Sequence, residues 1–186
     1  MPVLTVIIGS TRPGRAALPI ARWFTEQATQ HGGFDVRVAD LTDINLPLMN
    51  EAKHPVFRQY EHEHTIRWSE IVATSDAFVI VSPEYNHGYS AVIKNALDYL
   101  MVEWAYKPVG FVSYGGVAGG TRAVAQLKPV VTQLRMTPVS DTIIIPNHTQ
   151  MIDEAGTFQS NDILNFSALG MLNEIAKLEG ALRPIR

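Results

Sequence analysis

The sequence predicts an α/β domain in which parallel strands alternate with helices. Nearly continuous apolar runs occur at residues 3–8, 77–81 and 108–114, and each is followed by a turn-rich segment and then by a stretch with helical spacing. Apolar runs bounded in this way are typical of strands that are covered on both faces. Strands that alternate with helices at this spacing predict a parallel sheet with helices on both of its faces.

The remaining elements follow from the pattern along the chain. Residues 16–31 have helical composition and end at a Gly-Gly pair, and residues 34–39 alternate apolar and charged side chains. That alternation predicts a strand near one side of the sheet, less buried than the first strand. Beyond it we expect a surface loop at 40–55, helices at 56–74, 90–104, 121–134 and 163–178, the last ended by Gly180, and a further strand at 139–145.

Five strands in 186 residues fit a single domain over residues 1–186. This number suits the doubly wound, flavodoxin-like sheet with strand order 2-1-3-4-5 better than a six-stranded sheet. In such sheets a ligand binds at the carboxyl edge, where the strand order reverses. We therefore expect a ligand between the loops that follow the first and third strands.

The composition excludes several classes of protein. The formal net charge of −3 does not suggest a nucleic-acid-binding surface, which is normally basic. No run of about 18 apolar residues predicts a membrane helix, and no basic N-terminal region predicts a signal peptide. The chain has no cysteine, which removes disulfides, thiol nucleophiles and cysteine-based metal sites, and we expect a cytoplasmic protein.

The turn between the first strand and the first helix reads Gly-Ser-Thr-Arg-Pro-Gly-Arg and predicts a phosphate site. Two hydroxyls, Ser10 and Thr11, and two guanidiniums, Arg12 and Arg15, lie in this turn before a helix N-terminus. Helix N-termini attract anions, and guanidiniums bind phosphate through paired hydrogen bonds. Neither the Walker A pattern nor G-x-G-x-x-G is present. The alternative is an ordinary strand-to-helix turn with two solvated arginines.

The loops after the third and fourth strands reach the same edge of the predicted sheet. A flat aromatic cofactor needs a planar slot and a close approach of backbone. Pro83 would stiffen one wall of such a slot, Tyr85 or Tyr114 could stack on the ring, and the Gly115-Gly116 pair permits a close backbone approach. Taken alone, each loop could also be only a turn that leads into a helix.

Four short motifs carry a resemblance to a known family. They are Gly-Ser-Thr-Arg at 9–12, Pro-Glu-Tyr-Asn at 83–86, Lys-Asn-Ala-Leu-Asp at 94–98 and the glycine pairs within 115–120. Together they resemble the NADPH-dependent FMN reductases, and the resemblance covers nearly the whole chain. It implies bound FMN, NADPH or NADH as co-substrate, a small acceptor such as a flavin, quinone, azo compound or metal oxyanion, and a homodimer or homotetramer.

The resemblance also implies a set of FMN contacts. It places the phosphate at Ser10, Arg12 and Arg15, the ring against Pro83, Glu84, Tyr85 and Asn86, and further contacts at Ser113, Gly115 and Gly116. Many members of the family have a small hydroxyl residue in place of Arg15, and Pro-Gly in place of Ser90-Ala91.

No protein side chain is expected to act as nucleophile or base, because a flavin carries hydride chemistry itself. No metal site is expected either, since His62 and His64 are two residues apart and do not share a helix face. His87 lies in the ring loop and either contacts substrate or is solvated. Two other functions stay open from the sequence: a flavodoxin-type electron carrier without enzymatic activity, and a flavin-binding regulatory module.

The predicted helix at 90–104 is more apolar than a helix that packs one face on a sheet. Its apolar residues are interrupted by Lys94, Asn95 and Asp98, which lie on one side of the helix. A second packing partner would account for the surplus, and a two-fold dimer is the commonest way to supply one. We therefore expect a homodimer at least, with Lys94 and Asp98 in or near the interface.

Overall fold

The computed structural model describes residues 1–186 and contains a five-stranded parallel sheet in the order β2-β1-β3-β4-β5, so the predicted order is confirmed. Every residue of the central strands β3 and β4 is buried, whereas the edge strand β2 has only one buried residue. This difference explains why the central strands have unbroken apolar runs and β2 alternates. The strands are β1 (Val3–Ile8), β2 (Asp35–Asp40), β3 (Ala77–Pro83), β4 (Pro108–Tyr114) and β5 (Thr137–Ile145).

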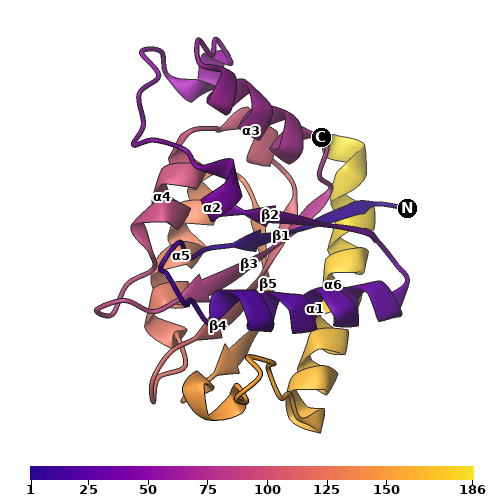
Figure 1. Ribbon diagram of the computed structural model, residues 1–186. Coiled ribbons are helices and arrows are strands. Elements are labelled where there is room, and N and C mark those ends of the chain that lie inside the picture. The colour runs from indigo at the N-terminus through magenta and orange to yellow at the C-terminus, as the bar shows by residue number, and fades with distance from the viewer.

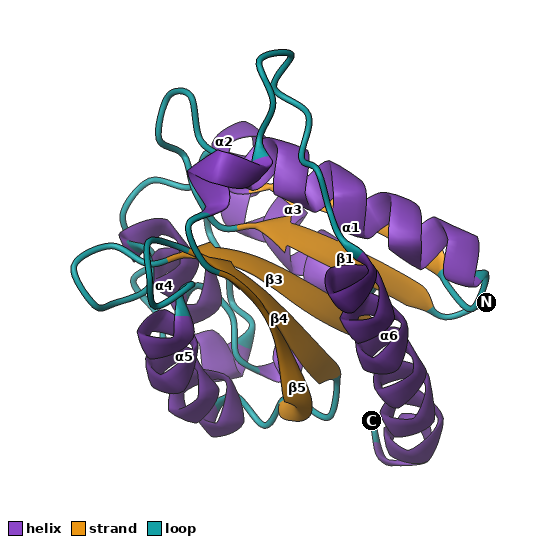
Figure 2. Ribbon diagram, turned by 90° about the horizontal axis from the view of Figure 1, so that it is seen from below, coloured by secondary structure: helices purple, strands orange, loops and turns teal.

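Helices cover both faces of the sheet, as Figures 1 and 2 show. Helices α1 and α6 pack on one face, and α3, α4 and α5 pack on the other, so the sheet separates two hydrophobic cores. No helix is long and apolar enough to cross a membrane. The helices are α1 (Ala17–His31), α2 (Leu41–Ile44), α3 (Glu63–Ala73), α4 (Ala91–Asp98), α5 (Thr121–Gln133) and α6 (Asp162–Leu182).

The second helix prediction was wrong at its beginning. Instead of a helix from residue 56, the chain forms a short 3₁₀ turn at Pro55–Phe57, and α3 begins only at Glu63. The Glu51 carboxylate accepts the backbone N–H groups of Glu61 and His62, at 2.9 and 3.1 Å, which holds this segment in a loop. The predicted surface loop before it also contains the short helix α2.

The predicted helix at 90–104 was too long, because α4 ends at Asp98 and a separate 3₁₀ turn follows at Val102–Trp104. The Trp104 indole N–H donates to the Leu97 carbonyl at 3.2 Å, and the indole is fully buried. Burial of this large ring therefore turns the chain inward. The indole N–H also occupies the Leu97 carbonyl, which would accept a backbone N–H if the helix continued.

The same ending overturns the argument that linked this stretch to a dimer. Tyr99, Leu100 and Trp104 are all buried within the chain's own core, whereas Val102 stays 43% exposed. The apolar surplus therefore fills the core on one face of the sheet, and it does not require a second chain.

Helix α6 was predicted to stop at Gly180, and this was also wrong. The helix continues to Leu182, and the chain after it is held at Arg183 and Arg186. Arg183 donates to Glu179 at 2.8 Å, and Arg186 donates to the Asp76 carboxylate at 2.9 Å. These contacts keep the last turn helical despite the glycine.

The Lys-Asn-Ala-Leu-Asp motif lies on α4 and holds a neighbouring loop. The Asn95 amide donates to the Pro47 carbonyl at 2.7 Å and accepts from the Met49 N–H at 3.0 Å. Lys94 and Asp98 form an exposed ion pair one turn apart. The motif therefore fixes the loop after α2 against α4, beside the carboxyl edge of the sheet where the site lies.

Candidate functional site

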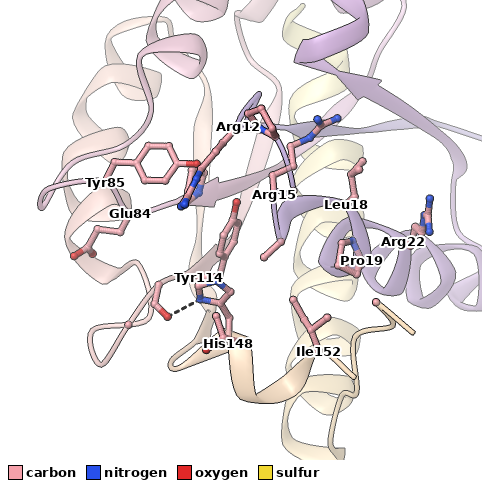
Figure 3. A pocket seen from close by; sticks show the side chains of 18 residues that line it. Arg12, Arg15, Leu18, Pro19, Arg22, Glu84, Tyr85, Tyr114, His148 and Ile152 are labelled. Carbon is pink, nitrogen blue, oxygen red and sulfur yellow. Dashed lines mark hydrogen bonds between the residues drawn. The ribbon is translucent and has the colours of Figure 1, made fainter. Parts of the chain in front are cut away.

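A cavity of about 720 Å³ opens at the carboxyl edge of the sheet. Its walls come from the loop between β1 and α1, the first turns of α1, the ends of β3 and β4, and the loop after β5 (Figure 3). This volume is within the usual range of small-molecule sites. The cavity therefore lies where the predicted switch point of the sheet places a ligand.

The loop between β1 and α1 offers hydrogen-bond donors that have no partner in the protein. The N–H groups of Thr11 and Gly14 donate to no protein acceptor. Helix α1 has Ala16 at its N-cap, without a side-chain cap, and no acidic residue in its first turn. Its positive end is therefore available to an anion at the cavity.

The start of this loop is fixed by close packing against α4. A Cβ at Gly9 would lie 2.3 Å from the Ile93 side chain and 2.8 Å from the Val81 carbonyl, so a larger residue does not fit. Ser90, the N-cap of α4, donates its hydroxyl to the Gly9 carbonyl at 2.6 Å. Ser90 thus anchors the start of the loop to α4.

The two predicted phosphate arginines differ in what they contact. Arg12 is exposed, forms no ion pair and lines the cavity (Figure 3). Arg15 instead pairs with Asp40 at 2.5 Å, although its Nε is buried without a partner. Arg12 is therefore free to bind an anion, whereas the Arg15 head group is already engaged.

Three hydroxyl side chains meet near this loop. Ser10 is fully buried and its Oγ is hydrogen-bonded to the Tyr85 hydroxyl at 2.8 Å. The Tyr114 hydroxyl is buried without a protein partner. Burial, and secondarily the nearby Tyr85, raise the pKa of Tyr114 above its usual range. The Tyr114 hydroxyl therefore stays protonated and is a buried donor without a protein acceptor.

Residues 85–88 form a two-residue β-hairpin. Tyr85 and Gly88 exchange backbone hydrogen bonds of 2.9 and 3.0 Å, and the two residues between them, Asn86 and His87, both have positive φ. Asparagine adopts this conformation readily, as in type I′ turns. Pro83, Glu84 and Tyr85 line the cavity, but Asn86 lies in the turn outside the lining. A ring contact by Asn86 stays a prediction.

Glu84 is held by Arg122, a residue that sequence reasoning missed. Arg122 donates its Nε to Glu84 at 2.6 Å and its backbone N–H at 3.1 Å, so the carboxylate caps α5. Burial by itself would raise the pKa of Glu84, but the hydrogen bonds and charge of Arg122 outweigh it and lower the pKa. Arg122 also donates to His87 Nε2 at 2.7 Å, which places His87 outside the cavity lining.

The Gly-rich turn after β4 offers free backbone donors. The N–H groups of Gly116, Val117 and Ala118 donate to no protein acceptor. Gly120 has φ of 88°, and a Cβ there would lie 2.7 Å from the Ser113 Cβ. The Ser113 hydroxyl is buried and donates to the Gly119 carbonyl at 2.9 Å. Gly115 and Gly116 thus line the cavity, whereas Ser113 braces the turn, and its contact with a cofactor stays a prediction.

The loop after β5 adds a wall that the sequence analysis did not assign. His148 lies edge-on to Tyr114, with ring centroids 5.0 Å apart, and its Nδ1 donates to the Gly115 carbonyl at 2.7 Å (Figure 3). Ile152 and Pro19 line the cavity beside it. The rule that parallel strands end at one edge, applied to β5 as well, would have pointed to this loop.

The residues around the cavity fit a phosphorylated, flat ligand. One end presents Arg12 and the uncapped N-terminus of α1, both of which attract an anion. Both nearby carboxylates, Asp40 and Glu84, are already paired with arginines. The other end presents the backbone of two loops and aromatic edges, which suits a planar ring.

Comparison with known proteins identifies the family. A model of the NADPH-dependent FMN reductase family matches residues 2–150. The chain belongs to the NADPH-dependent FMN reductase family. It is 41% identical over 149 residues to an NAD(P)H-dependent FMN reductase of Schizosaccharomyces pombe, covering 78% of this chain and 74% of that protein.

Further relatives have similar descriptions. The NAD(P)H-dependent FMN reductase LOT6 of Saccharomyces cerevisiae is 34% identical over 150 residues, covering 75% of this chain and 78% of that protein. Among solved structures, the chain is similar to FerB, a flavoenzyme NAD(P)H:(acceptor) oxidoreductase of Paracoccus denitrificans, with a TM-score of 0.75 and 21% sequence identity. The match covers 98% of this chain and 99% of the FerB chain. The latter likeness supports the flavodoxin-like fold of this FMN reductase family member.

Proposed function

We propose that this chain is an NAD(P)H-dependent FMN reductase, built as one domain over residues 1–186, which passes electrons from NAD(P)H to a small acceptor. The observation that carries the proposal is the cavity itself, which joins an anion-attracting end to a flat, backbone-lined end in a member of this family. When bound, FMN supplies the hydride chemistry, so the protein contributes binding, orientation and electrostatics.

The phosphate end would be held by the loop between β1 and α1. Arg12 is the free guanidinium, and the N–H groups of Thr11 and Gly14 together with the α1 N-terminus supply neutral donors. Ser10 belongs to the same loop, and its hydroxyl is held in place by the hydrogen bond to the Tyr85 hydroxyl. Arg15 would act through the field of its charge and by holding Asp40 away from the phosphate.

The ring end would be held between two rigid loops. Pro83, Glu84 and Tyr85 form one wall, which Arg122 fixes through Glu84. The opposite wall is the Gly115-Gly116 backbone, with free N–H groups that can donate to ring oxygens and nitrogens. Both walls are fixed before a ligand arrives, which lowers the entropic cost of binding.

The decisive experiment uses the purified protein. We expect it to be yellow, and we expect NADPH to bleach the flavin absorbance in the absence of air, with colour returning when a quinone or azo dye is added. A flavodoxin-type carrier would bind flavin and be bleached slowly or not at all by NADPH. A regulatory module that has lost the flavin would remain colourless even after incubation with FMN.

We also propose that the protein works as a homodimer or homotetramer in the cytoplasm, where NAD(P)H is available. The support for assembly is the surface beside α4, where Leu48, Met49 and Val102 are 82%, 38% and 43% exposed. The exposed Lys94–Asp98 pair on the same helix could pair with its own copy across a two-fold axis. Light scattering at micromolar concentration tests this, and a monomer would contradict it.

A further inference from the structure

The cavity contains a single imidazole, whose Nε2 is not used in the proposed phosphate and ring contacts. His148 begins the 3₁₀ turn His148–Met151 after β5 and lines the cavity. Its Nδ1 must carry a proton, because it donates to the Gly115 carbonyl at 2.7 Å. The other nitrogen, Nε2, has no partner in the protein, so it is free to carry and release a proton.

The other ionisable groups around the cavity are poor proton donors. The three arginines, Arg12, Arg15 and Arg22, do not release protons in proteins. Glu84 is ionised and tied to Arg122, and burial raises the pKa of Tyr114.

The last ionisable side chain of the cavity is Tyr85, and its hydroxyl is already hydrogen-bonded to the Ser10 hydroxyl at 2.8 Å. Imidazole is the side chain that gains and loses a proton near neutral pH. Among the titratable side chains of this cavity, His148 is thus the candidate acid, because its Nε2 has no protein partner.

Reduction of a quinone or an azo bond needs such an acid. Each reaction adds two electrons and two protons to the acceptor, and a hydride delivers both electrons with one proton. We propose that protonated His148 gives its Nε2 proton to the acceptor oxygen or nitrogen that does not receive the hydride, and is then reprotonated by water. This rests on the proposed function, in which NAD(P)H supplies the electrons through FMN.

Substitution by asparagine separates this role from support of the loop. In His148→Asn the side-chain amide can still donate to the Gly115 carbonyl, but it has no acidic group in place of Nε2. His148→Gln is the second variant if the first fails to fold. His31→Gln is the matched control, since His31 ends α1 far from the cavity.

The measurements compare acceptors that do and do not need a proton. With FMN-loaded protein at pH 7, we expect His148→Asn to slow quinone and azo-dye reduction by about 100-fold. Ferricyanide takes single electrons without protons, so its reduction rate should change by less than about twofold. Reduction of the bound flavin by NADPH should also stay within about twofold of wild type.

A binding constant and a pH profile complete the test. The FMN dissociation constant of His148→Asn should match that of wild type and His31→Gln, and the pH dependence of quinone reduction seen in wild type should be lost in His148→Asn. Equal slowing of ferricyanide and quinone, an unchanged pH profile in the variant, or loss of FMN would overturn the proposal. Failure of wild type to reduce any acceptor would instead overturn the proposed function.

Discussion

Helices α1 and α5 begin at the same edge of the sheet, each after a glycine-containing turn, yet their N-termini meet different surroundings. Neither helix has a capping side chain at its own N-cap or an acidic residue in its first turn. At α5 the Glu84 carboxylate, which directly follows β3, accepts a hydrogen bond from the Arg122 backbone N–H at 3.1 Å and so caps the helix. At α1 no carboxylate takes this place, and Arg12 lies nearby without an ion pair.

This difference shows how the protein selects one anion site out of two. A helix N-terminus attracts negative charge over its first turn only. The N-terminus of α5 is capped by the Glu84 carboxylate of the same chain, and this contact also fixes the ring wall. The N-terminus of α1 has no such cap and is therefore available to a ligand. The five predictions below test this contrast, from the largest expected effect to the smallest.

The largest effect should come from removing the phosphate of the ligand. Riboflavin lacks the group that the α1 N-terminus and Arg12 would bind, and charge-assisted hydrogen bonds contribute about 1.5–3 kcal/mol each. We expect riboflavin to bind at least about 100-fold more weakly than FMN. Fluorescence titration measures both constants, and equal affinities would show that α1 does not bind the phosphate.

The second effect compares the two arginines of the β1–α1 loop. Arg12→Ala should weaken FMN binding about 10- to 100-fold, because it removes a free guanidinium. Arg15→Ala should weaken it less, because that side chain is paired with Asp40. Riboflavin binding should change little in either variant. Arg37→Ala, which removes an arginine from an exposed pair on β2, is the control.

The third effect concerns the N-terminus of α5, which Glu84 caps. Glu84→Gln should lower the free energy of unfolding by about 1–2 kcal/mol at pH 7, because it removes the charge of the ion pair with Arg122 and one of the two carboxylate oxygens that accept from Arg122. Urea denaturation measures the difference. Glu63→Gln, which alters an exposed carboxylate in the first turn of α3, should change stability by less than about 0.5 kcal/mol.

The same carboxylate predicts a dependence on pH. The pKa of Glu84 is lowered in the folded protein, so its stabilising effect is fully present above the unfolded value of about 4.3. The effect is lost as pH falls through the lower folded pKa. The stability difference between wild type and Glu84→Gln should therefore shrink below about pH 4. A difference that persists unchanged at pH 2.5 would contradict the assigned pairing.

The smallest effect should come from His87, which lies in the hairpin but outside the cavity. His87→Ala removes one hydrogen bond from Arg122 and leaves the Glu84 pair in place. We expect FMN affinity within about twofold of wild type, and a loss of stability near 0.5–1 kcal/mol. If His87→Ala abolished FMN binding while Arg12→Ala preserved it, the assigned roles of the two loops would be reversed.

The resemblance of four short motifs was enough to place the chain in its family, and the apolar runs were enough to predict the sheet order. These features are local, because strand burial appears directly as an unbroken apolar run. The motifs of the β1 and β3 loops also led to Arg12, Pro83 and Tyr85, which line the cavity. Element ends were less well predicted, since those at α3 and α4 depend on Glu51 and Trp104, which act through tertiary contacts.

The sequence by itself determined the doubly wound fold and the edge of the sheet that carries the site, because both follow from residue type and spacing along one segment. Only the tertiary structure decided which charged groups at that edge are free. Arg12 and Arg15 are three residues apart in the same loop, yet Asp40 pairs only with Arg15. Glu84 likewise forms an ion pair with Arg122. His148, from the loop after β5, lines the cavity. Such pairings depend on distances between segments far apart in sequence, which composition and periodicity do not contain.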